Sequence, residues 1–187
     1  MAKAKTELED KLILSGKDIL ELGDLGESLV GGKNYNMAIL SQIKGIRVPS
    51  FRAVSSKAFH LLLDSCQVNA ELVRHMVKRE YERVTWGSKS TIEDPDFLRD
   101  FVRRVADTIR KEPSRRERTI SLRAFIDNTL EGFTTSKEDI DSLRMRAILV
   151  QVAILSVDMP HTISEAVRQA HHDMSLEAGV SDLNLAV

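Results

Sequence analysis

Apolar positions in the first third of the chain come in short runs that glycines interrupt. Leu12-Ile13-Leu14 and the run from Ile19 to Leu22 are both too short for periodicity to distinguish a strand from a helix. Four glycines then break the pattern within ten residues, at positions 23, 26, 31 and 32. We therefore expect turns throughout this stretch.

Helical spacing of apolar residues returns at Asn34 and predicts a short amphipathic helix that ends at Gly45. Pro49 pushes the residue before it away from helical angles, so an extended segment is expected there. The alternation in Phe51-Arg52-Ala53-Val54 is typical of a strand. Ser55 or Ser56 is then expected to cap a helix with Phe59, Leu62 and Leu63 on its apolar face.

After residue 67 glycine becomes rare, and most apolar stretches follow a helix start signal. Asn69 is expected to cap a helix that continues to about Val84, and Asp94-Pro95 to open the next one. Ser114 with Glu117 fits a capping box. Ser136 is predicted to cap a further helix, which Pro160 separates from a last helix ending at Gly179. Four large residues are predicted to be buried in this helical part: Phe97, Phe101, Leu143 and Leu155.

The composition supports a helical fold. Aromatic residues make up 5% of the chain, which is low in the residue types that sheets prefer. With 187 residues the chain is long enough to bury a sizeable core. The predicted class is α+β, predominantly helical, with a few strands near the two ends of the chain.

Charge and cysteine content limit the function classes. The formal net charge is −1, which disfavours a nucleic-acid-binding role for the whole chain. The single cysteine, Cys66, cannot form an internal disulfide or a multi-cysteine zinc site. No apolar run approaches the ~18–20 residues of a membrane span, and the two lysines near the start precede no apolar stretch. We therefore expect no membrane interaction and a cytoplasmic location.

The cluster Gly31-Gly32-Lys33 carries the strongest chemical signal. Two glycines allow the backbone to approach a ligand closely, a following helix offers free N–H groups, and Lys33 adds a positive charge. Together these features could hold a phosphate group. A P-loop is excluded, because its first glycine would fall on Glu27 and its Ser/Thr on Asn34. A plain turn that enters a helix remains the alternative interpretation.

A series of short motifs surrounds this lysine. The segment Val30-Gly31-Gly32-Lys33-Asn34 is followed by a short predicted helix, by Gly45-Ile46-Arg47-Val48-Pro49 and by Ser55-Ser56-Lys57-Ala58-Phe59. This order of motifs resembles the N-terminus of the phosphoenolpyruvate synthase and pyruvate phosphate dikinase family. The similarity covers about residues 18–63. In one motif the chain departs from the family, because Phe51 and Arg52 stand where the family has glycine and an aromatic residue.

This resemblance implies part of an ATP-grasp-type nucleotide-binding domain with an enlarged helical insertion. Residues 1–66 would form the family-like segment, 67–179 a helical subdomain or insertion, and 180–187 the start of a truncated strand. Gly31, Gly32 and Lys33 would contact the phosphates of ATP, with magnesium as a further cofactor of the parent enzyme. No catalytic residue and no metal ligand of this chain is implied.

The parent protein would be an ATP-dependent transferase, of the pyruvate, water dikinase type. It would phosphorylate a histidine and pass the phosphoryl group to a second substrate. The remaining domains of the parent chain would be the partners, and this chain alone is expected to be inactive. The alternative is a helical protein-interaction module that retains the family's entry motif without using ATP.

Two other features give weaker signals. His171-His172-Asp173 has metal-ligand residue types, but adjacent histidines point to different faces of a helix, so a solvated surface is the preferred interpretation. Between Arg99 and Arg123 nine basic residues stand against four acidic ones. Aromatic side chains do not alternate with them, so we interpret this stretch as a solvated face near an acidic partner surface.

Overall fold

The computed structural model describes residues 2–85, 94–131 and 140–178. They divide into two compact units: unit 1 comprises Met1–Leu62 and Met159–Val187, and unit 2 comprises Leu63–Asp158. The fold is predominantly helical, as the sequence predicts, with two small sheets. The expected location of the strands is wrong in part, because the strands Gln67–Asn69 and Thr119–Ser121 pair in the stretch that the sequence predicts to be helical. The last helix groups with unit 1 and not with the other helices that follow residue 67.

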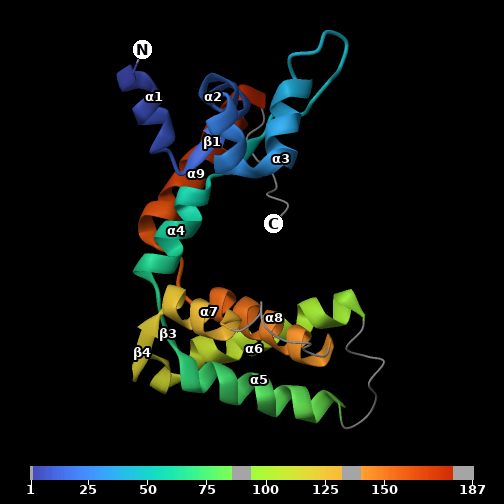
Figure 1. Ribbon diagram of the computed structural model, residues 1–187, viewed down its shortest axis with the longest axis vertical. Helices are drawn as coiled ribbons and strands as arrows, with labels where there is room; N and C mark the ends of the chain where they lie inside the picture. The colour runs from blue at the N-terminus through green and yellow to red at the C-terminus, as the bar shows by residue number, and fades with distance from the viewer. Residues whose placement is uncertain (1, 86–93, 132–139, 179–187) are drawn as a thin grey trace. The chain divides into compact units, whose positions relative to one another are not determined.

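Unit 1 contains a two-stranded antiparallel sheet and the helices around it (Figure 1). Strand β1 pairs with β2 so that Leu14 lies opposite Ala53. Both residues are buried, at 0% and 3% exposure. The elements of this unit are α1 (Ala2–Glu9), β1 (Ile13–Ser15), α2 (Gly16–Leu22), α3 (Asp24–Leu40), β2 (Arg52–Val54) and α9 (His161–Ala178), with α4 (Ser56–Ser65) continuing into unit 2.

A capping box fixes the start of α2. The backbone N–H of Asp18 donates to Ser15 Oγ, and the Asp18 carboxylate accepts hydrogen bonds from the Ser15 backbone and hydroxyl and from Lys11 Nζ. Burial raises the pKa of Asp18, but the hydrogen bonds from Ser15 and Lys11 outweigh it, so the pKa lies below its ordinary value. The negative charge is thereby kept at a helix N-terminus, where it is favourable.

The glycine turns predicted between residues 23 and 32 are confirmed at Gly23 and Gly31, which have positive φ and interrupt the helices, and are wrong at Gly26 and Gly32, which lie within helical stretches. Helices α2 and α3 meet at Gly26, where a Cβ atom would collide with the carbonyl oxygen of Ile19. Glycine therefore serves close packing of the two helices here, not a turn. The predicted end at Gly45 is also wrong, since α3 ends at Leu40.

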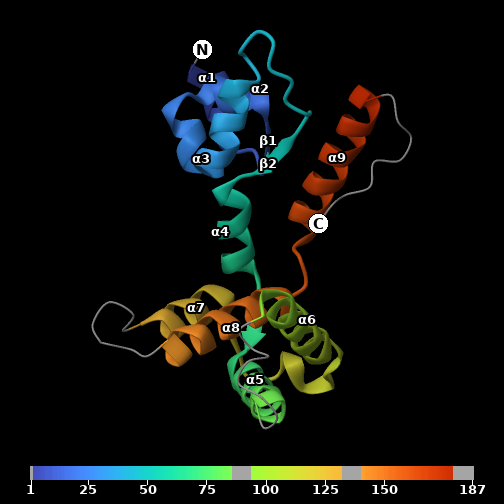
Figure 2. The ribbon, with the colours of Figure 1, turned by 90° about the vertical axis from the view of Figure 1, so that its right-hand side faces the viewer.

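Unit 2 is a set of helices around α8, which packs against α5, α6 and α7 (Figures 1 and 2). Its second sheet pairs β3 with β4 antiparallel, with Val68 opposite Ile120. The elements of this unit are β3 (Gln67–Asn69), α5 (Ala70–Thr85), α6 (Pro95–Lys111), the 3-10 helix η2 (Pro113–Arg116), β4 (Thr119–Ser121), α7 (Leu122–Leu130) and α8 (Ile140–Ser156).

Two predicted caps in unit 2 are confirmed and one is wrong. Asn69 Oδ1 accepts from the Leu72 N–H at 3.0 Å, and Asp94 caps α6. The box predicted at Ser114 and Glu117 does not form, because a proline-led 3-10 turn occupies that segment and Ser121 caps the next helix instead. Ser136 and Gly179, with the strand expected over 180–187, lie outside the described residues.

The burial predictions are confirmed for some residues and wrong for others. Phe101 is 3% exposed and lies in the core of unit 2. Phe97 and Leu143 are only half-buried, and Leu155 is 42% exposed. In unit 1, Phe59 on α4 is exposed as well. The helical spacing of these apolar residues suggests that their side chains are buried. Whether a side chain is in fact buried depends on which face of its helix packs against neighbouring elements.

Candidate functional site

The Gly31-Gly32-Lys33 cluster lies at a kink inside α3. Gly31 has φ 75° and ψ 157°, so it separates two helical stretches. These angles fall in a region that is essentially restricted to glycine. A Cβ atom at Gly31 would meet nothing within 4 Å, which shows that the backbone is open at this point. The expected turn is confirmed, although a helical stretch precedes it and the second stretch starts at Gly32, two residues earlier than predicted.

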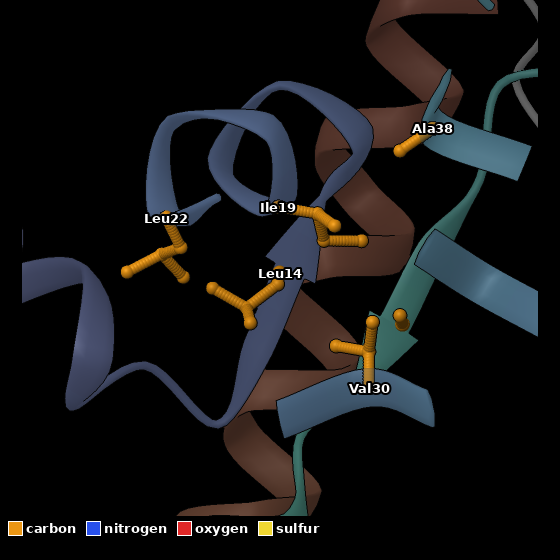
Figure 3. Packing of buried hydrophobic residues seen from close by; sticks show 6 residues of the cluster. Leu14, Ile19, Leu22, Val30 and Ala38 are labelled. Carbon is orange, nitrogen blue, oxygen red and sulfur yellow. The ribbon is translucent and has the colours of Figure 1, made fainter. Parts of the chain in front are cut away.

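Buried residues on both sides hold the kink in place. Val30 and Ala38 belong to the core of unit 1, together with Leu14, Ile19 and Leu22 (Figure 3). The Asn34 side-chain amide donates to the carbonyl oxygen of Val30 at 2.9 Å, across the kink. Because both helical stretches are anchored in one core, the backbone between them keeps a defined geometry.

Lys33 follows the kink and is exposed, as predicted. Within the part of the chain that the structure describes, its Nζ makes no hydrogen bond or ion pair. The first N–H groups of a helical stretch have no partner within that stretch, and the helix dipole places partial positive charge there. The kink thus combines an open backbone, the start of a helical stretch and a lysine without an ion pair, which is an arrangement suited to a phosphate group.

The structure offers no separate metal centre among its described residues. No group of three or more His, Cys, Asp and Glu side chains in those ranges could hold an ion. The Asp173 carboxylate accepts from Gln169, and the His171 carbonyl oxygen accepts from Ser175. The segment His171-His172-Asp173 therefore lies on a hydrogen-bonded helix.

The segment before β2 shows a contact that sequence reasoning missed. Ser50 Oγ donates to the Glu177 carboxylate at 3.2 Å, and the Arg52 guanidinium forms an ion pair with the same carboxylate. Phe51 is half-buried against the core of unit 1 and lies beside Gly16. Glu177 is 125 residues from Arg52, and no local pattern in α9 marks it as a partner. Of the two residues that depart from the family motif, Arg52 therefore binds the end of α9 and Phe51 packs against the core of unit 1.

A membrane span is not formed by any single helix of the described chain, since none is both long and apolar enough. Residues Asp141–Ser156 and His161–Glu177 reach the length and hydropathy of a membrane span only when they are taken together, as two helices joined by a bend. The buried core helices of a soluble protein reach the same values, so this finding is weak evidence for a membrane span.

The chain is similar to curated proteins named as phosphoenolpyruvate synthase or probable phosphoenolpyruvate synthase. The protein of that name from Pyrococcus furiosus is 25% identical over 169 residues, which cover 89% of this chain and 17% of the relative. A probable phosphoenolpyruvate synthase from Pyrococcus abyssi is 22% identical over 85% of this chain, and one from Pyrococcus horikoshii is 23% identical over 85%. The chain thus spans about one sixth of the length of these relatives. No solved structure matches it.

One family model matches most of the chain. It is described as "Pyruvate phosphate dikinase, AMP/ATP-binding domain", and it covers residues 27–187, which include the Gly31-Gly32-Lys33 kink. The match extends well beyond the motifs of the first 63 residues, so the helical part is included as well. The chain therefore belongs to the pyruvate phosphate dikinase AMP/ATP-binding domain family.

Proposed function

We propose that unit 1 contributes the phosphate-contacting part of an ATP site, with the kink at Gly31 and the side chain of Lys33 as its binding elements. The observation that carries this proposal is the unpaired, exposed Lys33 directly after an open glycine backbone, in a chain of an ATP-binding family. Backbone N–H groups after Gly31 would donate to phosphate oxygens. Lys33 would neutralise their charge.

Magnesium would enter this site with the nucleotide. In the described ranges, no group of three or more His, Cys, Asp and Glu side chains could hold a metal ion. The described residues therefore do not form a magnesium site by themselves. When bound, the ion would screen phosphate charge and favour phosphoryl transfer. The task left to this chain is to hold and orient the phosphates.

The parent enzyme is proposed to use ATP to phosphorylate a histidine of another domain and then pass the phosphoryl group to a second substrate. This part of the proposal rests on the likeness to phosphoenolpyruvate synthases, of which the chain spans a small part. We further infer that this chain alone does not catalyse the reaction. One lysine and a helix start, open to water, would hold ATP with about millimolar affinity, which corresponds to about 4 kcal/mol.

A helical interaction module without ATP use is the second candidate. The observation that favours it is the segment Ser50-Phe51-Arg52, whose side chains bind Glu177 and the core of unit 1. These positions therefore have structural partners. Under this alternative the kink at Gly31 would be only a bend in α3.

Titration of the chain with ATP and magnesium, followed by amide NMR shifts, distinguishes the two candidates. We expect shifts confined to Gly31–Asn34 that saturate at millimolar nucleotide. Lys33→Ala should weaken them severalfold. Lys44→Ala is the matched control, because Lys44 is an exposed lysine of the same unit with no partner among the described residues. Absence of shifts at these amides, or equal effects of the two variants, would favour the module.

A further inference from the structure

Unit 2 contains a groove between α6 and α8 that the proposed ATP site does not use. Its volume is about 780 Å³, and all of its lining residues belong to unit 2. Val102 and Ala106 of α6 and Ile154 and Leu155 of α8 form an apolar floor. Leu155 is 42% exposed there.

Helix α8 is apolar on more sides than its neighbours cover. From Ala147 to Leu155 only Gln151 is polar. A helix that is hydrophobic all round is normally enclosed on every side. Helices α5, α6 and α7 cover α8, yet the groove leaves Ile154 half-buried and Leu155 exposed. The sequence of α8 thus indicates that this helix has a further packing partner in addition to α5, α6 and α7.

Arginines line the α6 side of the groove. Arg99, Arg103 and Arg110 all contribute to it, and Asp107 is the one acidic residue among those that line it. Arg99 pairs with Asp96 at 3.0 Å and Arg110 with Asp107 at 3.3 Å, but both pairs are exposed and therefore weak. Within the described ranges Arg103 has no partner. The rim is positive, and its charges are available to a ligand.

We propose that this groove binds an amphipathic helix of a protein partner, with apolar residues facing the floor and acidic residues along the α6 side. The groove extends along α6 from Pro95 to Arg110, which is about 22 Å at 1.5 Å per residue and matches a helix of about four turns. In helix-in-groove recognition an amphipathic helix lays its apolar face into a hydrophobic groove, and the positive rim here would complement acidic residues on the flank of that helix. Nucleic acid fits less well, because the floor is aliphatic and offers no aromatic surface for bases.

Three fluorescent 18-residue peptides test this proposal on the full chain. All carry the same leucine stripe at helical spacing, with glutamate, lysine or glutamine at the flanking positions. We expect the glutamate peptide to bind at least about tenfold more tightly than the lysine peptide in fluorescence anisotropy, with a preference that declines as salt is added.

Two pairs of variants localise the binding. Arg103→Glu should weaken the glutamate peptide about tenfold, whereas Arg104→Glu should change it less than about twofold. Arg104 is the neighbouring exposed arginine and does not line the groove. Leu155→Asp should abolish binding, whereas Leu130→Asp should not. Leu130 is the matched control for Leu155, because the two leucines are almost equally exposed, at 41% and 42%.

Several results would overturn the proposal. They include no binding of the glutamate peptide up to about 1 mM, equal binding of the acidic and basic peptides, or equal effects of Arg103→Glu and Arg104→Glu. Self-association of the chain that Leu155→Asp abolishes and Leu130→Asp preserves would assign the groove to a second copy. Saturable binding of dodecanoate, without binding of any peptide, would assign it to a small amphiphile.

Discussion

The side chain of Asn34 is hydrogen-bonded to the backbone of Val30, with the amide nitrogen 2.9 Å from the carbonyl oxygen. The two residues enclose Gly31, Gly32 and Lys33 between them. The bond thus connects the end of one helical stretch to the first turn of the next. Gly31 has unusual angles in a segment that is fixed on both sides, so a substitution there cannot relax easily.

Substitution of the two adjacent glycines should therefore have opposite effects. Gly31→Ala places a side chain in a glycine-only conformation and should lower the free energy of unfolding by about 1–3 kcal/mol. Gly32→Ala should be neutral or stabilising by up to about 1 kcal/mol, because its Cβ would meet only Glu27 Oε1 at an ordinary 3.5 Å. Urea melts of both variants measure the difference. Equal losses would show that the kink is not specific to Gly31.

The two phenylalanines of α6 should differ in their contribution to stability. Phe101 is 3% exposed, so Phe101→Ala should cost about 3–5 kcal/mol. Phe97 is half-buried, and Phe97→Ala should cost about 1–2 kcal/mol because less apolar surface is lost. Denaturant unfolding of each variant gives both values. A loss below about 1 kcal/mol for Phe101→Ala would contradict the packing of α6 in unit 2.

The capping box at α2 predicts a defined loss of stability in acid. The folded-state pKa of Asp18 lies below its unfolded value, so its stabilisation is complete above the unfolded pKa of about 3.9. It is lost as the pH falls through the lower, folded pKa. The stability difference between the natural chain and Asp18→Asn should therefore be largest at neutral pH and should shrink below about pH 4. Urea melts between pH 3 and pH 7 measure it.

Ser15→Ala is the control for this pH dependence. Ser15 Oγ accepts from the Asp18 N–H and donates to its carboxylate. Its removal should cost about 0.5–2 kcal/mol and should reduce the effect of Asp18→Asn. An unchanged effect of Asp18→Asn in the Ser15→Ala background would show that the two side chains act independently.

The single thiol should react slowly in the folded chain. Cys66 is buried, its Sγ donates to the Asp158 carbonyl oxygen at 3.4 Å, and burial, helped by the nearby Asp158 charge, raises the pKa of the thiol. Since the thiolate is the reactive form, a disulfide reagent at pH 7.5 should modify the folded chain at least about tenfold more slowly than the chain in urea. Equal rates would indicate that the segment around β3 opens readily.

Local sequence signals predicted the elements that depend on local chemistry. Asn69 and Asp94 cap helices because a short polar side chain can satisfy the free N–H groups wherever the chain turns into a helix. Gly26 was wrongly interpreted as a breaker because its role depends on the approach of α2, which no local pattern shows. Likewise the Lys33 turn was predictable, whereas the Glu177 contact with Ser50 and Arg52 was not, because it joins segments far apart in the sequence.

The two-part construction of unit 1 affects how the chain can fold on the ribosome. Helix α9 contacts strand β1, but α9 is synthesised only after the whole stretch from Leu63 to Asp158. The contact between β1 and α9 therefore cannot form before that stretch is complete. At about 5–20 residues per second this delay is on the order of 5–20 s. Unit 2, by contrast, is continuous and can form its core as soon as it leaves the exit tunnel. Vectorial synthesis would thus complete unit 2 first, and β1 would acquire its contact with α9 last.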